Sequence, residues 1–238
     1  MHYGLLFSSI ALLVSAVQGH GAVSGYTING KEYPGYEGFS PASGPPTIQR
    51  QWKNYDPVTS VTDPKLRCNG GSSAPLNAQV SAGGSVTAKW KQWTHQQGPV
   101  LVWMYKCTSS FNTCDGSGKG WFKIDQKGLI KPPLASNDWA TGTIYKTKAW
   151  TSTVPKSLPA GNYLLRHEII ALHQANSPQF YAECAQLAVT GGGSSLPSAQ
   201  YLASIPGYAP QSHPGIKVDV YSSKATTYEL PGPAVWTG

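Results

Sequence analysis

Two histidines in this sequence have the positions that a metal site requires. His20 follows an apolar N-terminal segment and becomes the first residue of the chain if that segment is cleaved after Gly19. A free α-amine and an imidazole on one residue chelate a metal ion through two nitrogens, and an amine with an ordinary pKa of about 8 loses its proton to a metal at little cost. Several nitrogens in a plane suit Cu(II), which stands at the top of the divalent affinity order. The sequence therefore predicts a copper centre at His20, provided that a second histidine lies nearby.

His95 is the candidate for that second histidine. It lies in the turn-rich segment WTHQQGP directly before an apolar run, where a loop can present it at one edge of a sheet. Gln179 and Tyr181 are two positions apart in QFYAECAQLAV, so a strand turns both side chains the same way. Taken singly, His95 also fits a hydrogen-bonded loop histidine, Tyr181 a core aromatic and Gln179 a loop hydrogen-bonder. Glu183, the carboxylate of this segment, is expected to face away from Tyr181.

Two further histidines belong to the run NYLLRHEIIALH. If this run stays extended, His167 and His173 share one face with apolar residues such as Leu165 and Ile169. They fit satisfied core residues, or residues that support a metal ligand, at least as well as ligands themselves.

The N-terminus indicates where the protein acts. The segment from Gly4 to Val17 is apolar and uncharged but too short to cross a bilayer as a helix, and Gly19 follows it two residues later. Residues 1–19 are therefore interpreted as a secretory signal peptide, with a buried N-terminal helix as the alternative. No later stretch reaches transmembrane length, so we expect residues 20–238 to be a secreted, soluble monomer with no membrane contact.

Four cysteines remain after cleavage, an even number in an oxidising compartment, and two disulfides are expected from three possible connectivities. Cys107 and Cys114 flank a short Ser/Asn/Thr turn and form the natural local pair. Cys68 and Cys184 are left as a long-range pair that can anchor the strand carrying Tyr181. A zinc site is the competing interpretation, but the Cys-x-x-Cys spacing that it needs is absent.

The elements that must position these residues are strands. Alternation of apolar and polar residues runs through GSVTAKW and IKVDVY, and PVLVWMY is a continuous apolar run that suits a strand buried on both faces. Gly and Pro number 26 and 19, and turn clusters separate the runs. We predict an all-β protein, an antiparallel β-sandwich of the immunoglobulin or fibronectin kind, with long loops and short helical turns. One catalytic domain is expected over residues 20–238, with no separate carbohydrate-binding module.

Composition narrows the class of partner. Only 12% of residues are charged, against about a quarter in an ordinary domain, and 18 basic against 11 acidic residues give a net charge of +7. The basic residues are scattered without runs, which makes nucleic acid a poor partner. The 13 Tyr and 8 Trp with few charges suit stacking on a neutral polysaccharide.

The order of these motifs resembles the fungal lytic polysaccharide monooxygenases of auxiliary activity family 9, formerly glycoside hydrolase family 61. The resemblance covers the whole chain from His20 onward. The matching segments are HGAVSGYTING, CNGG, HQQGPVLVWM, GWFKI, NYLLRHEIIALH, QFYAECAQLAV and YELPGPAVW. Two departures are the short ALHQANSPQFY spacing, which affects a loop near the site, and His213 where relatives often carry Asp.

The resemblance implies a role for each candidate residue. His20 would give its amine and one ring nitrogen, His95 a third nitrogen and Tyr181 a distant oxygen to one copper ion that alternates between Cu(II) and Cu(I). His173 and Gln179 match the family's pair near the oxygen-binding position. The implied activity is oxidative cleavage of β-1,4-glucan chains such as cellulose at C1 or C4, with O2 or H2O2 and an external electron donor.

Two other classes of function compete with this interpretation. A glycoside hydrolase needs two carboxylates about 5 to 10 Å apart, and the motif-bearing segments contain few acidic residues. A non-catalytic carbohydrate-binding or wall-loosening protein keeps the sandwich and the aromatics without needing His20 at the terminus. Whether the protein oxidises the polysaccharide or only binds it, exposed rings must form the substrate face. Tyr33, Tyr36 and Tyr208 are the candidates because each lies beside Gly or Pro in a predicted loop.

Overall fold

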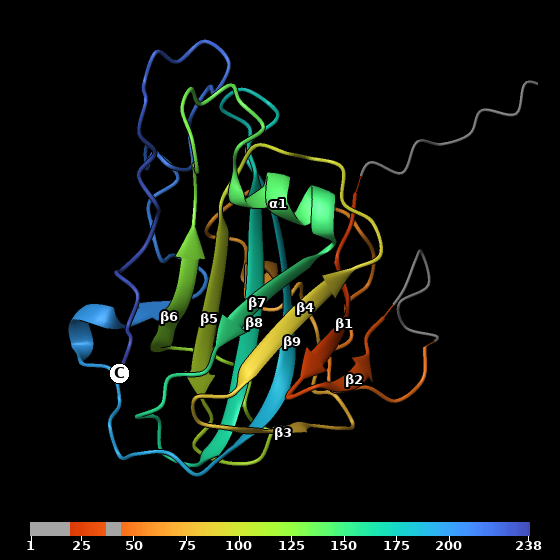
Figure 1. Cartoon of the computed structure of the whole chain (residues 1–238). Helices are drawn as coiled ribbons and strands as arrows, with labels where there is room; N and C mark the ends of the chain where they lie inside the picture. The colour runs from red at the N-terminus through yellow and green to blue at the C-terminus, as the bar shows by residue number, and fades with distance from the viewer. Residues whose placement is uncertain (1–19, 37–43) are drawn as a thin grey trace, which may run out of the picture.

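Two β-sheets pack face to face in the computed structural model, which describes residues 20–36 and 44–238 (Figure 1). One sheet has the order β2-β1-β4-β7 and the other β10-β6-β5-β8-β9-β3. All pairs are antiparallel except β3 with β9, which is parallel. The predicted all-β sandwich is therefore confirmed. The strands are β1 (Val23–Ile28), β2 (Lys31–Pro34), β3 (Ala78–Ser81), β4 (Ser85–Trp90), β5 (Val100–Lys106), β6 (Lys119–Lys127), β7 (Ala149–Thr153), β8 (Gly161–Ala171), β9 (Gln179–Thr190) and β10 (Ala203–Ser204).

Helical structure is short in the described part of the chain. The α-helix α1 (Ala140–Thr147) runs directly into β7, and two 3-10 turns, η2 (Pro64–Leu66) and η3 (Ala199–Tyr201), lie in loops. The helix ends at Lys148, which adopts a left-handed conformation with a φ of 56° and bonds back to Ile144 O. Short helices in connecting loops are what the sequence predicted.

The long strands β8 and β9 form the centre of the larger sheet, and their two faces differ. Arg166, Glu168 and Cys184 lie on one face, while His167, Tyr181 and Glu183 lie on the other, because successive side chains of a strand alternate. The register pairs His167 with Glu183 and Arg166 with Cys184. We call these the even face and the odd face, after the residue numbers.

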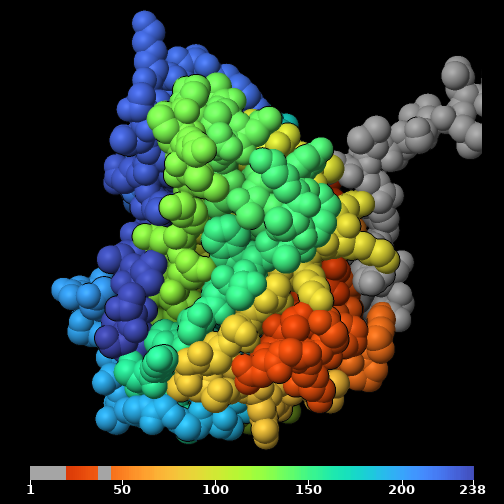
Figure 2. All heavy atoms as spheres, in the orientation of Figure 1, coloured from red at the N-terminus to blue at the C-terminus, as the bar shows by residue number. Residues whose placement is uncertain are grey.

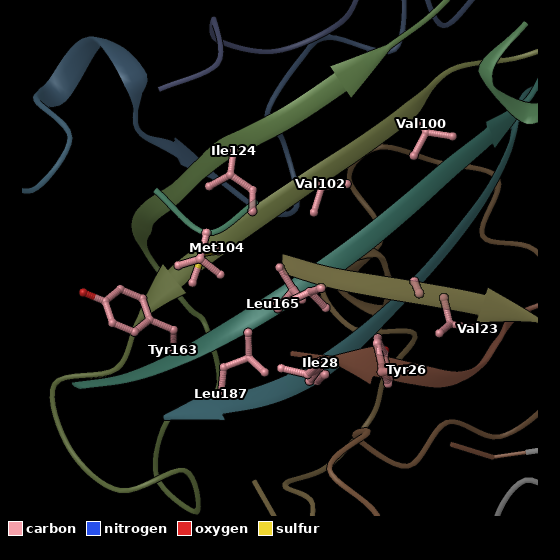
Figure 3. Close-up of a cluster of buried hydrophobic side chains, with 14 of the residues drawn as sticks. Val23, Tyr26, Ile28, Val100, Val102, Met104, Ile124, Tyr163, Leu165 and Leu187 are labelled. Atoms are coloured by element: carbon pink, nitrogen blue, oxygen red, sulfur yellow. The ribbon is translucent and has the colours of Figure 1, made fainter. Parts of the chain in front are cut away.

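The odd face packs against the smaller sheet. Figure 3 shows side chains from β1, β5, β8 and β9 that meet between the two sheets, among them Val23, Tyr26, Val102 and Leu165. The continuous apolar run of β5 is buried at every position from Val100 to Met104, as predicted for a strand covered on both sides. The sheets thus enclose one apolar layer, in which His167 and Glu183 are embedded.

The even face is covered by loops and by the C-terminal part of the chain. Figure 2 shows C-terminal residues, in blue, along the side of the molecule next to β6. The strand that alternation predicted over Ile216–Tyr221 is wrong. This segment forms turns and irregular backbone, with Ile216 and Val220 buried in this second layer. Alternation over six residues marks two anchoring side chains here rather than a paired strand. Near the C-terminus Trp236 packs edge-on against Phe122, so the chain returns to the larger sheet.

Both predicted disulfides are confirmed. Cys107 pairs with Cys114 across 7 residues and Cys68 with Cys184 across 116 residues. The long-range bond lies on the even face, so it anchors β9 from the side opposite Tyr181. The predicted signal peptide, residues 1–19, lies outside the described residues.

Candidate metal centre

The candidate residues gather where three strands of the larger sheet meet. The end of β8 pairs with the beginning of β9, Ala171 with Gln179, and the beginning of β5 pairs with the same part of β8, Val100 with Ile169. The loop that carries His95 leads into β5, and His173 follows β8 by two residues. Antiparallel pairing therefore places the two histidines and the start of β9 at one end of the sandwich.

His20 reaches this end from the smaller sheet. It stands three residues before β1, and Gln92 Nε2 donates to the His20 carbonyl at 2.6 Å from the loop after β4. Between His20 and β1 the backbone must approach closely, since a Cβ on Gly21 would lie 2.1 Å from the Gln92 carbonyl oxygen. Glycine is the only residue that permits this contact without moving the chain.

The His20 ring lies near the rings of two other candidate residues. The His20 ring centroid lies 6.3 Å from that of His95 and 5.9 Å from that of Tyr181. Trp93 stands edge-on to both His95 and Tyr181, at 5.5 and 5.0 Å between centroids, and its Nε1 donates to the His95 carbonyl at 2.6 Å. Trp93, which sequence reasoning missed, thus fixes both candidate ligands. Its place two residues before His95 in WTHQQGP was the available signal.

His173 and Gln179 stand beside the same group. The rings of His95 and His173 stack at 3.6 Å between centroids with 3° between their planes. Gln179 Oε1 accepts a hydrogen bond from the Tyr181 hydroxyl at 2.7 Å. All five residues predicted for the metal site and its surroundings, His20, His95, His173, Gln179 and Tyr181, are thus brought together.

The surroundings of the site keep His95, His173 and Tyr181 neutral. Burial, with the neighbouring His173 and His20, lowers the pKa of His95 to about 4, and burial also lowers the pKa of His173. Burial and the nearby Glu183 raise the pKa of Tyr181 well above its usual range. Neutral imidazoles are the form that binds metal ions, because the lone pair of one ring nitrogen is then free.

The donor set fits a copper ion. His95 Nε2 and His173 Nδ1 are buried and have no hydrogen-bond partner in the described part of the chain, an arrangement that costs free energy unless a ligand takes the lone pair. The described residues contain no group of three or more His, Cys, Asp or Glu side chains that could hold a metal ion. A metal here must therefore depend on two histidines, the amine of His20 and the Tyr181 phenol, and nitrogen-rich sets of this kind suit copper.

The prediction that Glu183 faces away from Tyr181 is wrong. Glu183 lies on the odd face with Tyr181 rather than facing away, because residues two apart in a strand point the same way. It is 1% exposed, and burial raises its pKa to about 8.

Two of the three rings predicted for a substrate face are buried, so that prediction is wrong for them. Tyr208 is 8% exposed and its hydroxyl donates to Glu168 Oε1 at 2.9 Å. Tyr36 is 5% exposed and packs with Trp52 and Tyr55. Both lie beside glycine in a loop, but each ring turns inward. Tyr33, on β2, is half-buried with the Lys31 ammonium 5.1 Å from its ring centroid.

Tyr221 is an exposed ring that the sequence reasoning did not choose. It is 52% exposed, and its hydroxyl lies 3.5 Å from Gln97 Oε1, two residues beyond His95. The loop that carries it is tied to the segment between His173 and Gln179 by a bond from Asn176 N to Val218 O of 3.0 Å. Its assignment to a strand concealed it, although it begins a run of polar turn residues.

In residues 20–36 and 44–238 no helix has the length and apolar character needed to cross a bilayer.

Comparison with known proteins places these features in a family. The profile of Auxiliary Activity family 9 (formerly GH61) matches residues 20–228. The AA9 family lytic polysaccharide monooxygenase D of Thermothelomyces thermophilus is 52% identical, over 97% of this chain and 93% of its own length. The AA9 family lytic polysaccharide monooxygenase B of Heterobasidion irregulare is 45% identical, over 98% of both chains.

Solved structures agree with the sequence comparison. A structure described as a cellulose-active polysaccharide monooxygenase from M. thermophila superposes with a TM-score of 0.86 at 52% identity, covering 92% of this chain and all of that one. The structure of HiLPMO9B gives a TM-score of 0.87 at 46% identity, with the same coverage.

Proposed function

The chain belongs to Auxiliary Activity family 9 and is a monooxygenase of that family, and from this premise we propose that it is a secreted copper enzyme that oxidises β-1,4-glucan chains. The oxidation falls on C1 or C4 beside a glycosidic bond, with O2 or H2O2 as the oxidant and an external donor as the source of electrons. The observation that carries the proposal is the convergence of His20, His95 and Tyr181 from three separate segments.

Three residues would hold the ion. His20 supplies its amine and one ring nitrogen, His95 a ring nitrogen and Tyr181 its phenol oxygen. Copper, when bound, supplies the one-electron redox chemistry that activates O2 or H2O2. Burial keeps the His95 imidazole neutral, and Trp93 and His173 fix the position of its ring.

Gln179 and His173 act on polar groups beside the ion. The Gln179 amide accepts from the Tyr181 hydroxyl and so orients the phenol, while its NH2 group is left to donate to an oxygen species or to water. His173, stacked on His95, places a second neutral imidazole next to the site and can hold or pass a proton at its ring nitrogen. Side chains that orient a ligand in this way tune both affinity and reactivity.

The amine of His20 exists only in a processed chain. We propose cleavage between Gly19 and His20, and the family match, which begins at residue 20, supports this boundary. We propose one catalytic domain over residues 20–238, which agrees with the family match to residue 228 and with the packing of Trp236 on Phe122.

Cellulose is the proposed substrate. A 52% identical relative is described as cellulose-active, and the exposed Tyr221 beside Gln97 offers a ring for stacking on a neutral chain. A flat polysaccharide surface provides no deep pocket to fill, so exposed rings near the metal must supply much of the binding.

The test is mass spectrometry of the products formed from cellulose with and without ascorbate. Oxidised oligosaccharides that form only with the reductant support the proposal. Unmodified oligosaccharides without reductant would indicate hydrolysis, and adsorption without any product would indicate a binding protein. A preparation that begins one residue before His20 serves as the matched control. In this preparation the backbone nitrogen of His20 is a peptide amide instead of a free amine, so it should bind copper poorly.

A further inference from the structure

The first residue of β1 is held by buried side chains from elsewhere in the chain. Val23 N–H donates to Glu183 Oε2 at 3.3 Å, and Val23 C=O accepts from Gln49 Nε2 at 2.6 Å. At this point the ladder between β1 and β4 is irregular, with a register shift between Val23 and Gly25. Two side chains thus fix the backbone where the strand pairing is disturbed.

Both side chains are enclosed. Glu183 is 1% exposed and Gln49 and Val23 are fully buried, so these bonds are made away from water. A backbone group that loses its partner in such surroundings pays the full cost of desolvation. Gln49 is in turn held by Tyr36 N–H, which donates to its Oε1 at 2.7 Å.

The bond from Glu183 joins the two sheets next to the metal centre. Glu183 belongs to β9 of the larger sheet and stands two residues after Tyr181 on the same face, whereas Val23 begins β1 of the smaller sheet. Only Gly21 and Ala22 separate Val23 from His20, whose carbonyl is held by Gln92. The N-terminal segment is therefore fixed at both ends, and one end is fixed by the strand that carries Tyr181.

We propose that Glu183 is a positioning residue that sets where His20 lies relative to Tyr181, by holding Val23 from the same strand. The proposal rests on the copper function proposed above. Because a single strand carries both the phenol and the carboxylate, any shift of β1 against β9 changes the separation between the nitrogen donors of His20 and the oxygen of Tyr181. Glu183 does not itself contact the ion in this scheme.

The chain offers a matched control for this role. Gln186 is on β9, is 1% exposed and also holds a backbone segment, accepting from Ala74 N–H at 2.9 Å and donating to the Ala74 and Leu76 carbonyls. It lies on the even face, away from His20. Loss of Gln186 disturbs a clamp of the same kind without touching the N-terminal segment.

The experiment compares the mature wild-type protein with Glu183→Leu, Glu183→Gln and Gln186→Leu. Exchange of the Val23 amide in the copper-free proteins is measured by NMR, copper affinity by calorimetry and the Cu(II) site by electron paramagnetic resonance. We expect Glu183→Leu to speed Val23 exchange and weaken copper binding by about tenfold or more, and to change the Cu(II) spectrum. Glu183→Gln keeps an acceptor oxygen and should restore all three, and Gln186→Leu should leave them as in the wild type.

The outcomes separate this proposal from the copper function. Wild-type protein that binds no copper refutes the copper function, while Val23 exchange still reports whether Glu183 holds the strand. Unchanged Val23 exchange in Glu183→Leu, or equal effects of Gln186→Leu on the copper spectrum, overturns the positioning role. If Glu183→Leu does not fold, Glu183→Met replaces it: this longer apolar side chain fills the same space without an acceptor for Val23 N–H, and unchanged Val23 exchange or an unchanged copper spectrum there overturns the proposal.

Discussion

The two faces of β8 and β9 treat polar groups in opposite ways. On the even face the Arg166–Glu168 ion pair is fully buried, at 2.7 Å, and each partner is bonded further. Arg166 donates to the Leu66 and Arg67 carbonyls, and Glu168 accepts from Trp103 and Tyr208. On the odd face both ring nitrogens of His167 and one oxygen of Glu183 are buried without a hydrogen-bond partner among the described residues.

This difference separates groups that stabilise the fold from groups that leave chemistry open. A saturated network is costly to break but binds nothing, since its donors and acceptors are already engaged. Unpartnered nitrogens, as on His95 and His173 at the end of the odd face, lower the stability of the protein and leave lone pairs for a ligand. The comparison predicts that changes on the even face alter stability alone, whereas changes at the end of the odd face alter metal binding.

The largest effect is expected from Glu168→Leu. This change leaves the Arg166 guanidinium buried without its counter-ion and removes the acceptor of Trp103 and Tyr208, which should lower the free energy of unfolding by about 3–5 kcal/mol. Urea unfolding of the copper-free protein measures the loss, and the folded variant should bind copper as the wild type does. The double variant Arg166→Met/Glu168→Leu should recover much of the stability; a single variant as stable as wild type would contradict the assignment.

His95→Ala should show the reverse pattern. Loss of one ring nitrogen from the site is expected to weaken copper binding by about 100-fold or more, equivalent to about 2.8 kcal/mol. The unfolding free energy of the copper-free protein should change by less than about 1 kcal/mol, because His95 is only half-buried and its Nε2 has no partner. His213→Ala, at a partly buried histidine whose Nε2 lies 3.3 Å from Glu229 Oε1, is the control that should leave copper binding unchanged.

His167 gives the odd face a pH dependence. Burial lowers the pKa of His167 from an ordinary 6.5 to about 3. Between these two pH values the unfolded chain binds a proton at His167 and the folded protein does not. Stability is lost as the pH falls from about 6.5 towards 3, and at pH 5 this loss amounts to about 2 kcal/mol. His167→Leu should remove it, measured as the difference in unfolding free energy between wild type and variant at pH 7 and pH 5.

The difference in unfolding free energy between wild type and His167→Leu isolates the contribution of His167 to the pH dependence. Its ring faces Glu183 from β9, Tyr26 from β1 and Trp90 from β4. The pKa of Glu183 is raised to about 8, which gives a contribution of the opposite sign, but the residue is present in both proteins and largely cancels. A difference that stays constant between pH 7 and pH 5 would show that His167 is protonated in the folded protein.

The sequence predicts the sandwich and the metal site because these depend on local patterns. Alternation and apolar runs located β4, β5 and β8, and His20 and His95 stand out by their positions next to the predicted cleavage site and a strand. Which way a loop side chain turns depends instead on contacts distant in the chain. Tyr208 is drawn inward by Glu168, 40 residues away, and no pattern in IPGYAP indicates that partner.

The smallest effect concerns the substrate face, where Tyr221 replaces Tyr208 as the candidate. Tyr221→Ala should weaken adsorption to cellulose by about 1 kcal/mol, or about fivefold, since one exposed ring no longer stacks on the chain. Copper affinity and melting temperature should stay the same because the ring is 52% exposed. The matched control is Tyr208→Phe, which removes a buried hydrogen bond to Glu168 and should lower stability by about 1 kcal/mol without changing adsorption.

These two tyrosines test whether the even face only stabilises the fold or also takes part in substrate binding. If Tyr208→Phe reduces adsorption, the even face takes part in substrate binding and its polar network is not purely structural. If Tyr221→Ala lowers the melting temperature instead of adsorption, its contact with Gln97 serves to hold the loop beside His95, and the ring belongs to the scaffold. Adsorption isotherms on cellulose, measured with and without copper, distinguish a ring that stacks on the substrate from one that acts through the metal site.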